Sequence, residues 1–234
     1  MSNFFALTIR ISSEALTTFS MPQLFPKWSN NAPKALLLGL TMKVVLIIFV
    51  VWYFFSPTFL EVGYAPEQPV PYSHKFHVGE LGIDCQYCHV SAFESAHVNI
   101  PATQTCMNCH GQIKTDSEKL APIRESWDTG KPVEWVRVHN LGDYAAFNHS
   151  AHVNVGIGCE SCHGRVDRME IVHQAEELSM GWCLDCHRAP EEHLRPVSEV
   201  TTMGYKNEDQ LAFGKRMVAQ KNIHAPQYCN GCHY

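Results

Sequence analysis

The 234-residue sequence has no basic cluster. Its 18 Lys and Arg residues are spread along the chain and are outnumbered by 23 Asp and Glu, which gives a formal net charge of −5 at pH 7. Proteins that bind nucleic acids present a positively charged face or stripe. The charge pattern therefore argues against nucleic acid as a partner.

No cysteine lies outside a single motif, CxxCH, which occurs five times. We number the sites in chain order: Cys85–Cys88–His89 (site 1), Cys106–Cys109–His110 (site 2), Cys159–Cys162–His163 (site 3), Cys183–Cys186–His187 (site 4) and Cys229–Cys232–His233 (site 5). CxxCH is the attachment signature of c-type haem. The two thiols reach the two vinyl groups of one porphyrin, and the following histidine binds the iron as its proximal ligand.

Two other uses of ten cysteines fit the spacing less well. An even cysteine count is compatible with disulfides, and structural zinc sites combine two CxxC pairs, or one pair with histidines. Five CxxC units do not divide evenly into four-cysteine zinc sites. Neither use requires a histidine directly after every second cysteine. The sequence therefore predicts five haem c groups.

Residues 35–55 carry a single charge, Lys43, in an otherwise apolar run. About 20 apolar residues span a bilayer as a helix. A signal peptide has a shorter apolar region and a small-residue cleavage site, and neither feature is present here. Basic residues precede the run, and none lies between residues 61 and 74. The positive-inside rule then predicts a single-pass anchor in the inner (cytoplasmic) membrane, with the haem domain on the periplasmic side.

Four segments are expected along the chain. Residues 1–34 form a cytoplasmic or interfacial segment, 35–60 the anchor helix, 61–71 a proline-containing linker, and 72–234 the haem domain. The 149 residues from Cys85 to His233 provide about 30 per haem, and stretches below about 40 residues seldom build an adequate core. We therefore expect a multihaem cytochrome c domain of the c7/c3 type, with loops, short α-helices, little β-structure and haems in its core. Helices are expected over 118–128, starting near Pro122, and over 208–220.

An internal repeat suggests the sixth iron ligands. Residues 72–85 and 147–159 each contain an aromatic residue, an HxxH pair and a loop into CxxCH. Histidines three apart share one face of a helical turn and can reach two neighbouring irons. Nine histidines lie outside the five motifs. The candidate sixth ligands are the four repeat histidines, His139, and Met180 as the rival of His139: His74, His77, His149, His152, His139 and Met180.

Weaker candidates complete the set of residues with a possible role at the haems. His97, His173, His193 and His224 are second-tier sixth ligands. Arg188 and Arg195 follow site 4 and could either pair with haem propionates, a geometry that Arg suits, or be solvated at the surface.

These motifs resemble the pentahaem cytochrome c subunit of alternative complex III, a bacterial quinol:electron-acceptor oxidoreductase. The resemblance rests on residues 72–89, 99–111, 136–169 and 178–196. The two repeats are also similar to the small c7-type cytochromes, in which the first histidine of HxxH serves the nearby haem and the second serves another. This resemblance implies that His74 binds the haem of site 1 and His149 that of site 3, with His77 and His152 on other haems.

The resemblance also implies a function and partners. The family's complex contains an iron–sulfur subunit, quinol-binding integral membrane subunits and a monohaem cytochrome subunit. Electrons pass onward to a soluble cytochrome c or a blue copper protein. An alternative is a stand-alone membrane-anchored multihaem quinol dehydrogenase that feeds periplasmic reductases. Catalysis at a haem needs an open iron position, which the pentahaem nitrite reductases keep with a CxxCK site. All five motifs here end in His, so we expect no catalytic residue.

Overall fold

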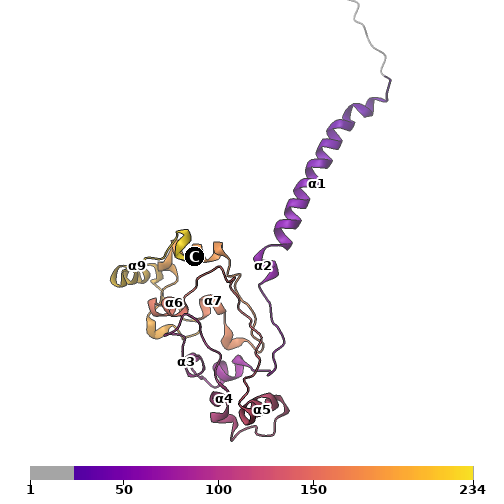
Figure 1. Cartoon of the computed structure of the whole chain (residues 1–234). Helices are drawn as coiled ribbons and strands as arrows, with labels where there is room; N and C mark the ends of the chain where they lie inside the picture. Colours follow the sequence, from indigo (N-terminus) through magenta and orange to yellow (C-terminus); the bar gives the residue numbers. More distant parts are fainter. Residues whose placement is uncertain (1–23, 234) are drawn as a thin grey trace, which may run out of the picture. The chain divides into compact units, whose positions relative to one another are not determined.

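The structure is a computed structural model of the chain, and it describes residues 24–233 (Figure 1). Most of the N-terminal segment expected over 1–34 therefore lies outside the described residues. The chain divides into two compact units, one ending at Trp52 and the other beginning at Tyr53.

The first unit is dominated by one apolar helix. A short 3-10 turn, η1 (Lys27–Asn31), leads into α1 (Ala32–Phe54), and none of the α1 side chains is buried. Within residues 24–233 this helix is long and apolar enough to cross a membrane, a test that a signal sequence near an N-terminus also passes. Its 23 residues extend over roughly 35 Å, which exceeds the about 30 Å of a hydrocarbon core. The expected apolar helix is therefore present.

The apolar helix ends six residues before the boundary expected at residue 60. It stops at Phe54, and a separate short helix, α2 (Pro57–Leu60), follows. Pro57 interrupts the helix because proline has no N–H and its ring clashes with the preceding turn. The Ser56 hydroxyl caps α2 by accepting a hydrogen bond from the Phe59 N–H at 3.3 Å, a role that serine favours.

The second unit consists of short helices joined by loops. Its longer elements are η2 (Lys75–Glu80), α3 (Cys85–Cys88), α4 (Thr103–His110), α5 (Ala121–Thr129), α6 (His149–Val155), α7 (Glu160–His163), α8 (Met180–Arg188) and α9 (Gln210–Lys221). The 3-10 turns are η3 (Glu118–Leu120), η4 (Val166–Arg168), η5 (Pro190–Glu192), η6 (Val197–Glu199) and η7 (Cys229–Gly231). Across residues 24–233 the β-structure is one isolated antiparallel bridge, Ile157–Leu194. The expected architecture of short helices and loops with little β-structure is confirmed for these residues.

The two predicted helices are present at nearly the predicted positions. The helix expected over 118–128 is the turn η3 followed by α5, with Pro122 in the first turn of α5. It ends at Gly130, whose φ of 70° is the left-handed conformation that terminates many helices. The helix expected over 208–220 is α9, which ends at Asn222.

The apolar core of the polypeptide is small. Among the described residues, the buried apolar side chains are Val70, Ile123, Val153, Met169, Leu194 and Val200. A domain of this length with so few buried apolar side chains needs another source of stability. This agrees with the expectation that the haems supply much of the core.

Residues 61–71, expected as a linker, are bound to the haem domain. The Gly63 N–H donates to the Gln174 carbonyl at 2.8 Å, and the Gln174 N–H donates back to the Tyr64 carbonyl at 3.0 Å. Further along, the Gln68 amide donates to the Val136 carbonyl and accepts from the Val136 N–H. Because Val70 is also buried, this segment is a strap fixed along the domain.

We expect Gly214→Ala to destabilise the haem domain by about 1–3 kcal/mol, the cost of overpacking a close contact. Gly214 lies on α9 where this helix crosses η5, and a Cβ there would meet the Glu191 carbonyl oxygen at 1.9 Å. Gly181→Ala is the matched control because a Cβ on Gly181 would have Ser179 Oγ as its neighbour at 3.8 Å. The control should be neutral or slightly stabilising. Guanidinium unfolding of the purified haem-loaded protein measures both, and equal effects would contradict the close contact at α9.

Candidate haem-binding sites

Short helical turns carry the five CxxCH motifs. Sites 1 to 4 lie on α3, α4, α7 and α8, and site 5 lies on η7. A helical turn places the two cysteines, three residues apart, on one face. Two of these turns have side-chain caps: Asp84 accepts from the Gln86 N–H ahead of α3 at 2.8 Å, and Ser179 accepts from the Trp182 N–H ahead of α8 at 3.2 Å. A capping side chain next to the motif therefore fixes the start of the turns at sites 1 and 4.

All ten cysteines are free thiols in the structure. Burial is the largest cause that raises the pKa of Cys88, Cys106 and Cys183 above its ordinary value, and it raises that of Cys162 to about 12. Nearby cysteines add to the effect at Cys162. These four thiols therefore stay neutral at pH 7. All ten cysteines are free, so each CxxCH pair is available for a porphyrin.

Three spare histidines face proximal histidines at a distinctive separation. The ring centroids are 6.2 Å apart for His77 and His110, 6.4 Å for His149 and His163, and 6.1 Å for His152 and His187. Two imidazoles bound to opposite sides of one metal ion have centroids roughly 6.3 Å apart, since a metal–nitrogen bond is about 2.0–2.1 Å. The three pairs thus fit the two axial positions of an iron at sites 2, 3 and 4.

The orientation of these rings leaves one nitrogen available for a metal. In seven axial candidates Nδ1 bonds a backbone carbonyl, which can only accept, so Nδ1 carries the proton and the Nε2 lone pair is available. The proximal bonds are His89 to Asn99 (3.4 Å), His110 to Ile113 (3.2 Å), His187 to Pro226 (2.6 Å) and His233 to Tyr144 (2.8 Å). The distal bonds are His77 to Ser73 (2.8 Å), His149 to Ala92 (3.1 Å) and His152 to Asn148 (2.7 Å).

The two repeats place their second histidine in the same way. The Tyr72 ring stacks on His77 at 4.4 Å and 20°, and the Phe147 ring packs on His152 at 4.5 Å and 32°. Each of these histidines also bonds the carbonyl four residues before it. The aromatic residue therefore fixes the plane of the imidazole, and Tyr and Phe serve equally because the contact uses the ring.

Burial keeps the central histidines neutral. It is the largest cause that lowers the pKa of His163 to about 3 and that of His74 to about 4, and neighbouring histidines, His89 among them for both, lower both further. Metal binding requires the neutral imidazole, so both rings are in the competent form at pH 7. His74 Nδ1 is buried without a hydrogen-bond partner. Because His89 is among the groups that lower the pKa of His74, His74 lies near site 1, as the c7 resemblance implies. Its role as the sixth ligand there stays a prediction.

His139 and Met180 do not form such a facing pair. The His139 ring lies edge-on to His163 at 4.4 Å and 79°, closer than two axial ligands of one iron would be. Its Nε2 is buried without a hydrogen-bond partner. Met180 begins α8 with 64% of its surface exposed. At site 5 the ring against His233 is that of Tyr144, at 6.0 Å. Which of His139 and Met180 supplies the remaining distal iron ligand therefore stays a prediction.

One second-tier histidine, His224, uses its Nε2 in a side-chain hydrogen bond. His224 is exposed, and its Nε2 bonds the Asn222 side chain at 2.9 Å. His173 Nδ1 bonds the Ile171 carbonyl at 3.4 Å. Because His224 uses the nitrogen that the axial candidates keep available, it is the least suited of the spare histidines to bind iron.

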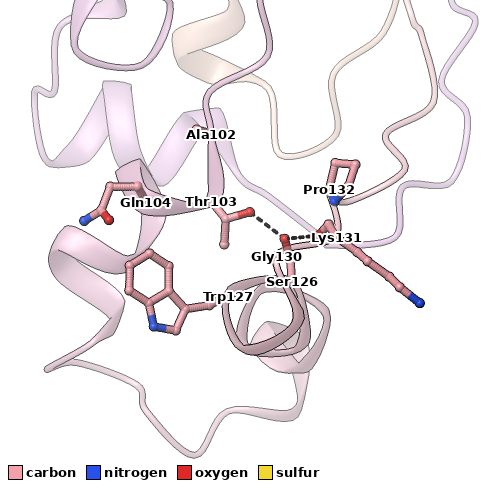
Figure 2. A pocket seen from close by; sticks show the side chains of 8 residues that line it. All are labelled: Ala102, Thr103, Gln104, Ser126, Trp127, Gly130, Lys131 and Pro132. Atoms are coloured by element: carbon pink, nitrogen blue, oxygen red, sulfur yellow. Dashed lines mark hydrogen bonds between the residues drawn. The ribbon is translucent and has the colours of Figure 1, made fainter.

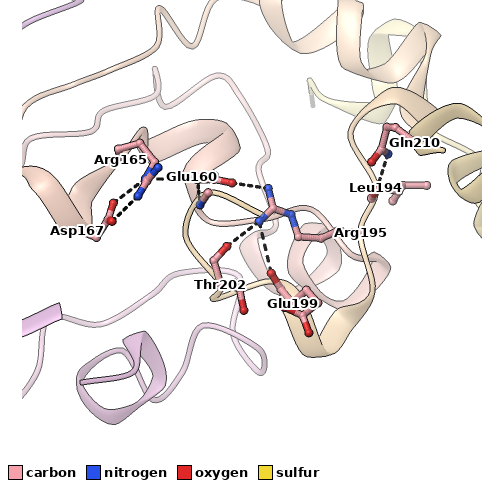
Figure 3. Close-up of polar contacts among 9 residues, drawn as sticks. Glu160, Arg165, Asp167, Leu194, Arg195, Glu199, Thr202 and Gln210 are labelled. Atoms are coloured by element: carbon pink, nitrogen blue, oxygen red, sulfur yellow. Dashed lines mark hydrogen bonds and ion pairs between the residues drawn. The ribbon is translucent and has the colours of Figure 1, made fainter. Parts of the chain in front are cut away.

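Arg195 is buried and bound to other protein groups, so it is neither a surface residue nor free to pair with a propionate (Figure 3). Sequence reasoning missed its role in holding the site 3 turn. Its guanidinium donates to Glu160 Oε1 at 2.8 Å and to the Thr202 carbonyl at 3.0 Å. Arg165 pairs with Asp167 at 2.6 Å beside it. Glu160 follows Cys159 directly, so this network holds the site 3 turn in place. Arg188 by contrast is exposed and pairs with Asp185 at 3.3 Å.

A pocket of about 380 Å³ lies beside site 2, between α4 and α5 (Figure 2). The hydroxyls of Thr103 and Ser126 are 2.6 Å apart in it, and Ser126 also donates to the Lys131 carbonyl at 2.6 Å. Cys106 lines an adjoining smaller pocket. These bonds tie α5 and its C-terminal turn to the helix that carries site 2.

The donor set and its geometry fit c-type haem. Each of five turns offers two free thiols and a histidine, and three of the proximal histidines face a second histidine at the separation of axial ligands. Bound haem iron takes up and releases one electron at a time, at a potential set by its axial ligands and burial. The polypeptide orients the ligands and excludes water.

Comparison with known proteins defines the class. Residues 70–124 match the sequence model of the family "cytochrome c7 and related cytochrome c" and form a cytochrome c7-like domain. The chain is also similar to the menaquinone reductase, multiheme cytochrome c subunit, of Nitratidesulfovibrio vulgaris (strain Hildenborough), with 33% identity over 122 residues. The match covers 51% of this chain and 55% of the relative, so the chain spans about half the length of the relative it matches. Residues 70–124 therefore form a c7-like cytochrome domain, and the similarity to a multihaem cytochrome c subunit supports a role in electron transfer.

We expect His152→Met to raise the midpoint potential of one haem, since His/Met ligation has a higher potential than His/His. The shift should be on the order of 0.1 V, within the about 0.8 V range that axial ligands span. Redox titration of the purified protein measures it, with the exposed His224→Met as the control. An unchanged titration would show that His152 is not an iron ligand.

Proposed function

We propose that this chain binds five haem c groups and relays electrons between a quinol-oxidising membrane complex and a periplasmic acceptor. The observation that carries the proposal is the set of three histidine pairs with centroids 6.1–6.4 Å apart. Iron held by two histidines has no open position for a substrate, so such haems exchange electrons without binding one. The chain itself has no catalytic residue in this proposal.

The proposed partners follow from the anchor helix and from the resemblance to alternative complex III. They are an iron–sulfur subunit, quinol-binding integral membrane subunits, a monohaem cytochrome subunit, and a soluble cytochrome c or blue copper protein as the acceptor. The similarity to a subunit of a menaquinone reductase supports a place beside a quinone-reactive membrane protein. α1 anchors the chain in the inner membrane, with the haem domain in the periplasm.

The same similarity favours a second candidate, a relay that runs toward the quinone. The relative is named as part of a menaquinone reductase. Both candidates use the same five haems, because electron transfer between haems is reversible and the potentials of the partners set its direction.

Purification from native membranes in mild detergent tests the proposal. We expect five haems per polypeptide by pyridine haemochrome assay, co-purifying iron–sulfur and multi-span subunits, and reduction of the haems by quinol. If the chain purifies alone and quinol still reduces it, it is a stand-alone quinol dehydrogenase. If a reduced periplasmic donor drives quinone reduction but quinol does not reduce the haems, the second candidate replaces the first. Fewer than five haems would contradict the haem count.

A further inference from the structure

Contacts between the five sites show which of them are neighbours. Sites 1 and 2 meet where His77, from the turn ahead of site 1, faces His110 of site 2 at 6.2 Å. The Asn108 amide on α4 also donates to the Tyr87 hydroxyl on α3 at 3.2 Å. These two contacts join the attachment turns of sites 1 and 2 directly.

Sites 1 and 3 also adjoin, which joins the two repeats. His149, which faces His163 of site 3, donates from Nδ1 to the carbonyl of Ala92, three residues after His89. The Asn154 amide on the same helix donates to the Phe93 carbonyl at 2.8 Å. The free thiols of Cys85 and Cys159, the first cysteines of the two sites, also lie close enough to interact. Site 3 therefore neighbours site 1, although site 2 lies between them in the sequence.

Sites 3, 4 and 5 follow in chain order. His152, on the helix that serves site 3, faces His187 of site 4 at 6.1 Å. His187 Nδ1 donates to the carbonyl of Pro226, three residues before Cys229, at 2.6 Å. The Gln227 amide donates back to the His187 carbonyl at 3.1 Å. Site 4 therefore lies between sites 3 and 5.

From these contacts we infer that the five sites form one unbranched row in the order 2–1–3–4–5, with sites 4 and 5 at the membrane end. Site 2 and site 5 are the two ends of the row. In Figure 1, α4, which carries site 2, and the adjoining α5 lie at the opposite end of the haem domain from α9 and the C-terminal segment.

The short segment between α1 and the strap identifies which end of the row is near the membrane. The last residue of α1, Phe54, is four residues before Thr58, so the two are separated by at most roughly 14 Å. Thr58 donates to Glu177 at 2.6 Å, and Ser179 donates to the same carboxylate at 2.7 Å. Ser179 caps α8, the helix of site 4. The chain therefore enters the haem domain beside site 4, within a few residues of the end of α1.

This order assigns a partner to each end. The membrane partner that handles quinol exchanges electrons at the site 4–5 end, and the water-soluble redox protein docks at site 2. The assignment of partners rests on the proposed function, whereas the order of the row does not. An electron that crosses the domain passes between the repeats at the Cys85–Cys159 contact.

Redox titration tests the order without any quinol. Cys85→Ser with Cys88→Ser removes the haem from site 1, and Cys106→Ser with Cys109→Ser removes it from site 2. Charges on adjacent irons interact, so loss of one haem shifts the midpoints of its neighbours. We expect site 1 loss to shift two of the four remaining midpoints and site 2 loss to shift one. The reverse result, or no shift in either variant, would overturn the order.

Ligand variants keep the test open if the haem-deficient proteins do not accumulate. His74→Met and His77→Met leave all ten cysteines in place, and each raises the potential of one haem at its own site. That haem is then reduced first, and its neighbours titrate at lower potentials. His74→Met should lower two other midpoints, whereas His77→Met, which acts on site 2, should lower one. Equal numbers of lowered midpoints in the two variants would contradict the row.

Stopped-flow reduction by quinol tests the two ends in the intact complex. Loss of the site 2 haem should leave the other four reducible by quinol but abolish electron delivery to the soluble acceptor. Loss of the site 1 haem should leave three haems quickly reduced and the site 2 haem oxidised, with dithionite as the control that reduces all four. Delivery that survives without site 2 and disappears without site 5 would reverse the ends. If quinol reduces no haem in the wild type, the proposed function fails while the titration still decides the order.

Discussion

Arg195→Ala is expected to lower the free energy of unfolding by about 3–5 kcal/mol, the usual cost of breaking one partner out of a buried ion pair. The Arg195 and Glu160 side chains are only 9% and 15% exposed. Removal of the guanidinium leaves the Glu160 charge with the 3.7 Å contact to Arg165 and the Gly204 N–H as its remaining partners. The Thr202 carbonyl also loses its donor.

Arg188→Ala is the matched control. The Arg188 and Asp185 side chains are 60% and 80% exposed, so the loss of this pair should cost no more than about 1 kcal/mol. Arg195→Lys should fall between the two, because lysine keeps the charge but lacks the planar fork that bonds Glu160 and a carbonyl together. Guanidinium unfolding of the haem-loaded protein, followed by far-UV circular dichroism, measures all three. Equal losses for the Arg195 and Arg188 alanine variants would show that the buried network does not stabilise site 3.

His163→Ala is expected to have the second large effect, because it removes the proposed proximal ligand at the centre of the inferred row of sites. His163 lies against His139 at 4.4 Å and faces His149 at 6.4 Å. Truncation of a large buried side chain costs about 3–5 kcal/mol, and a loss of 1–2 kcal/mol already changes protein abundance several-fold. We expect haem-loaded protein in the membrane to fall on the order of tenfold. Any protein that remains should show one haem with altered ligation.

Haem staining and the haem-to-polypeptide ratio in membranes measure this effect. His224→Ala is the control, since His224 is exposed and its Nε2 is bonded to Asn222. The control should keep the wild-type amount of protein and of haem. A His163→Ala protein with wild-type haem content and spectrum would show that His163 is not an iron ligand.

The CxxCH motifs could be recognised from sequence because each consists of five consecutive residues, and their role in haem attachment stays a prediction. A CxxCH turn carries both thiols and the proximal histidine on one short helix, so no distant contact is needed to recognise it. The equivalent settings of His77 and His152 were also foreshadowed, because aromatic residue, histidine pair and turn recur in the same local order. The short anchor-to-domain break at Ser56 and Pro57 was missed, although both residues carry a known signal for it.

The contacts that hold the rings had no signal in the sequence. The acceptors of the histidine Nδ1 protons are backbone carbonyls, which every residue possesses, so side-chain identity does not mark them. The pair of Arg195 with Glu160 joins residues 35 positions apart. Sequence reasoning therefore considered Arg195 as a partner of a haem propionate or as a surface residue. In the structure it instead binds Glu160 in the turn of site 3.

The sequence by itself determined the local features of this protein: ten cysteines in five CxxCH motifs, a surplus of histidines, and an apolar segment of membrane-spanning length. These features are local, because covalent spacing and composition define them. Tertiary structure alone decided that His77 faces His110 and His152 faces His187, and that site 3 adjoins site 1. Those relations depend on how loops return through space, and many loop paths are compatible with one set of motifs.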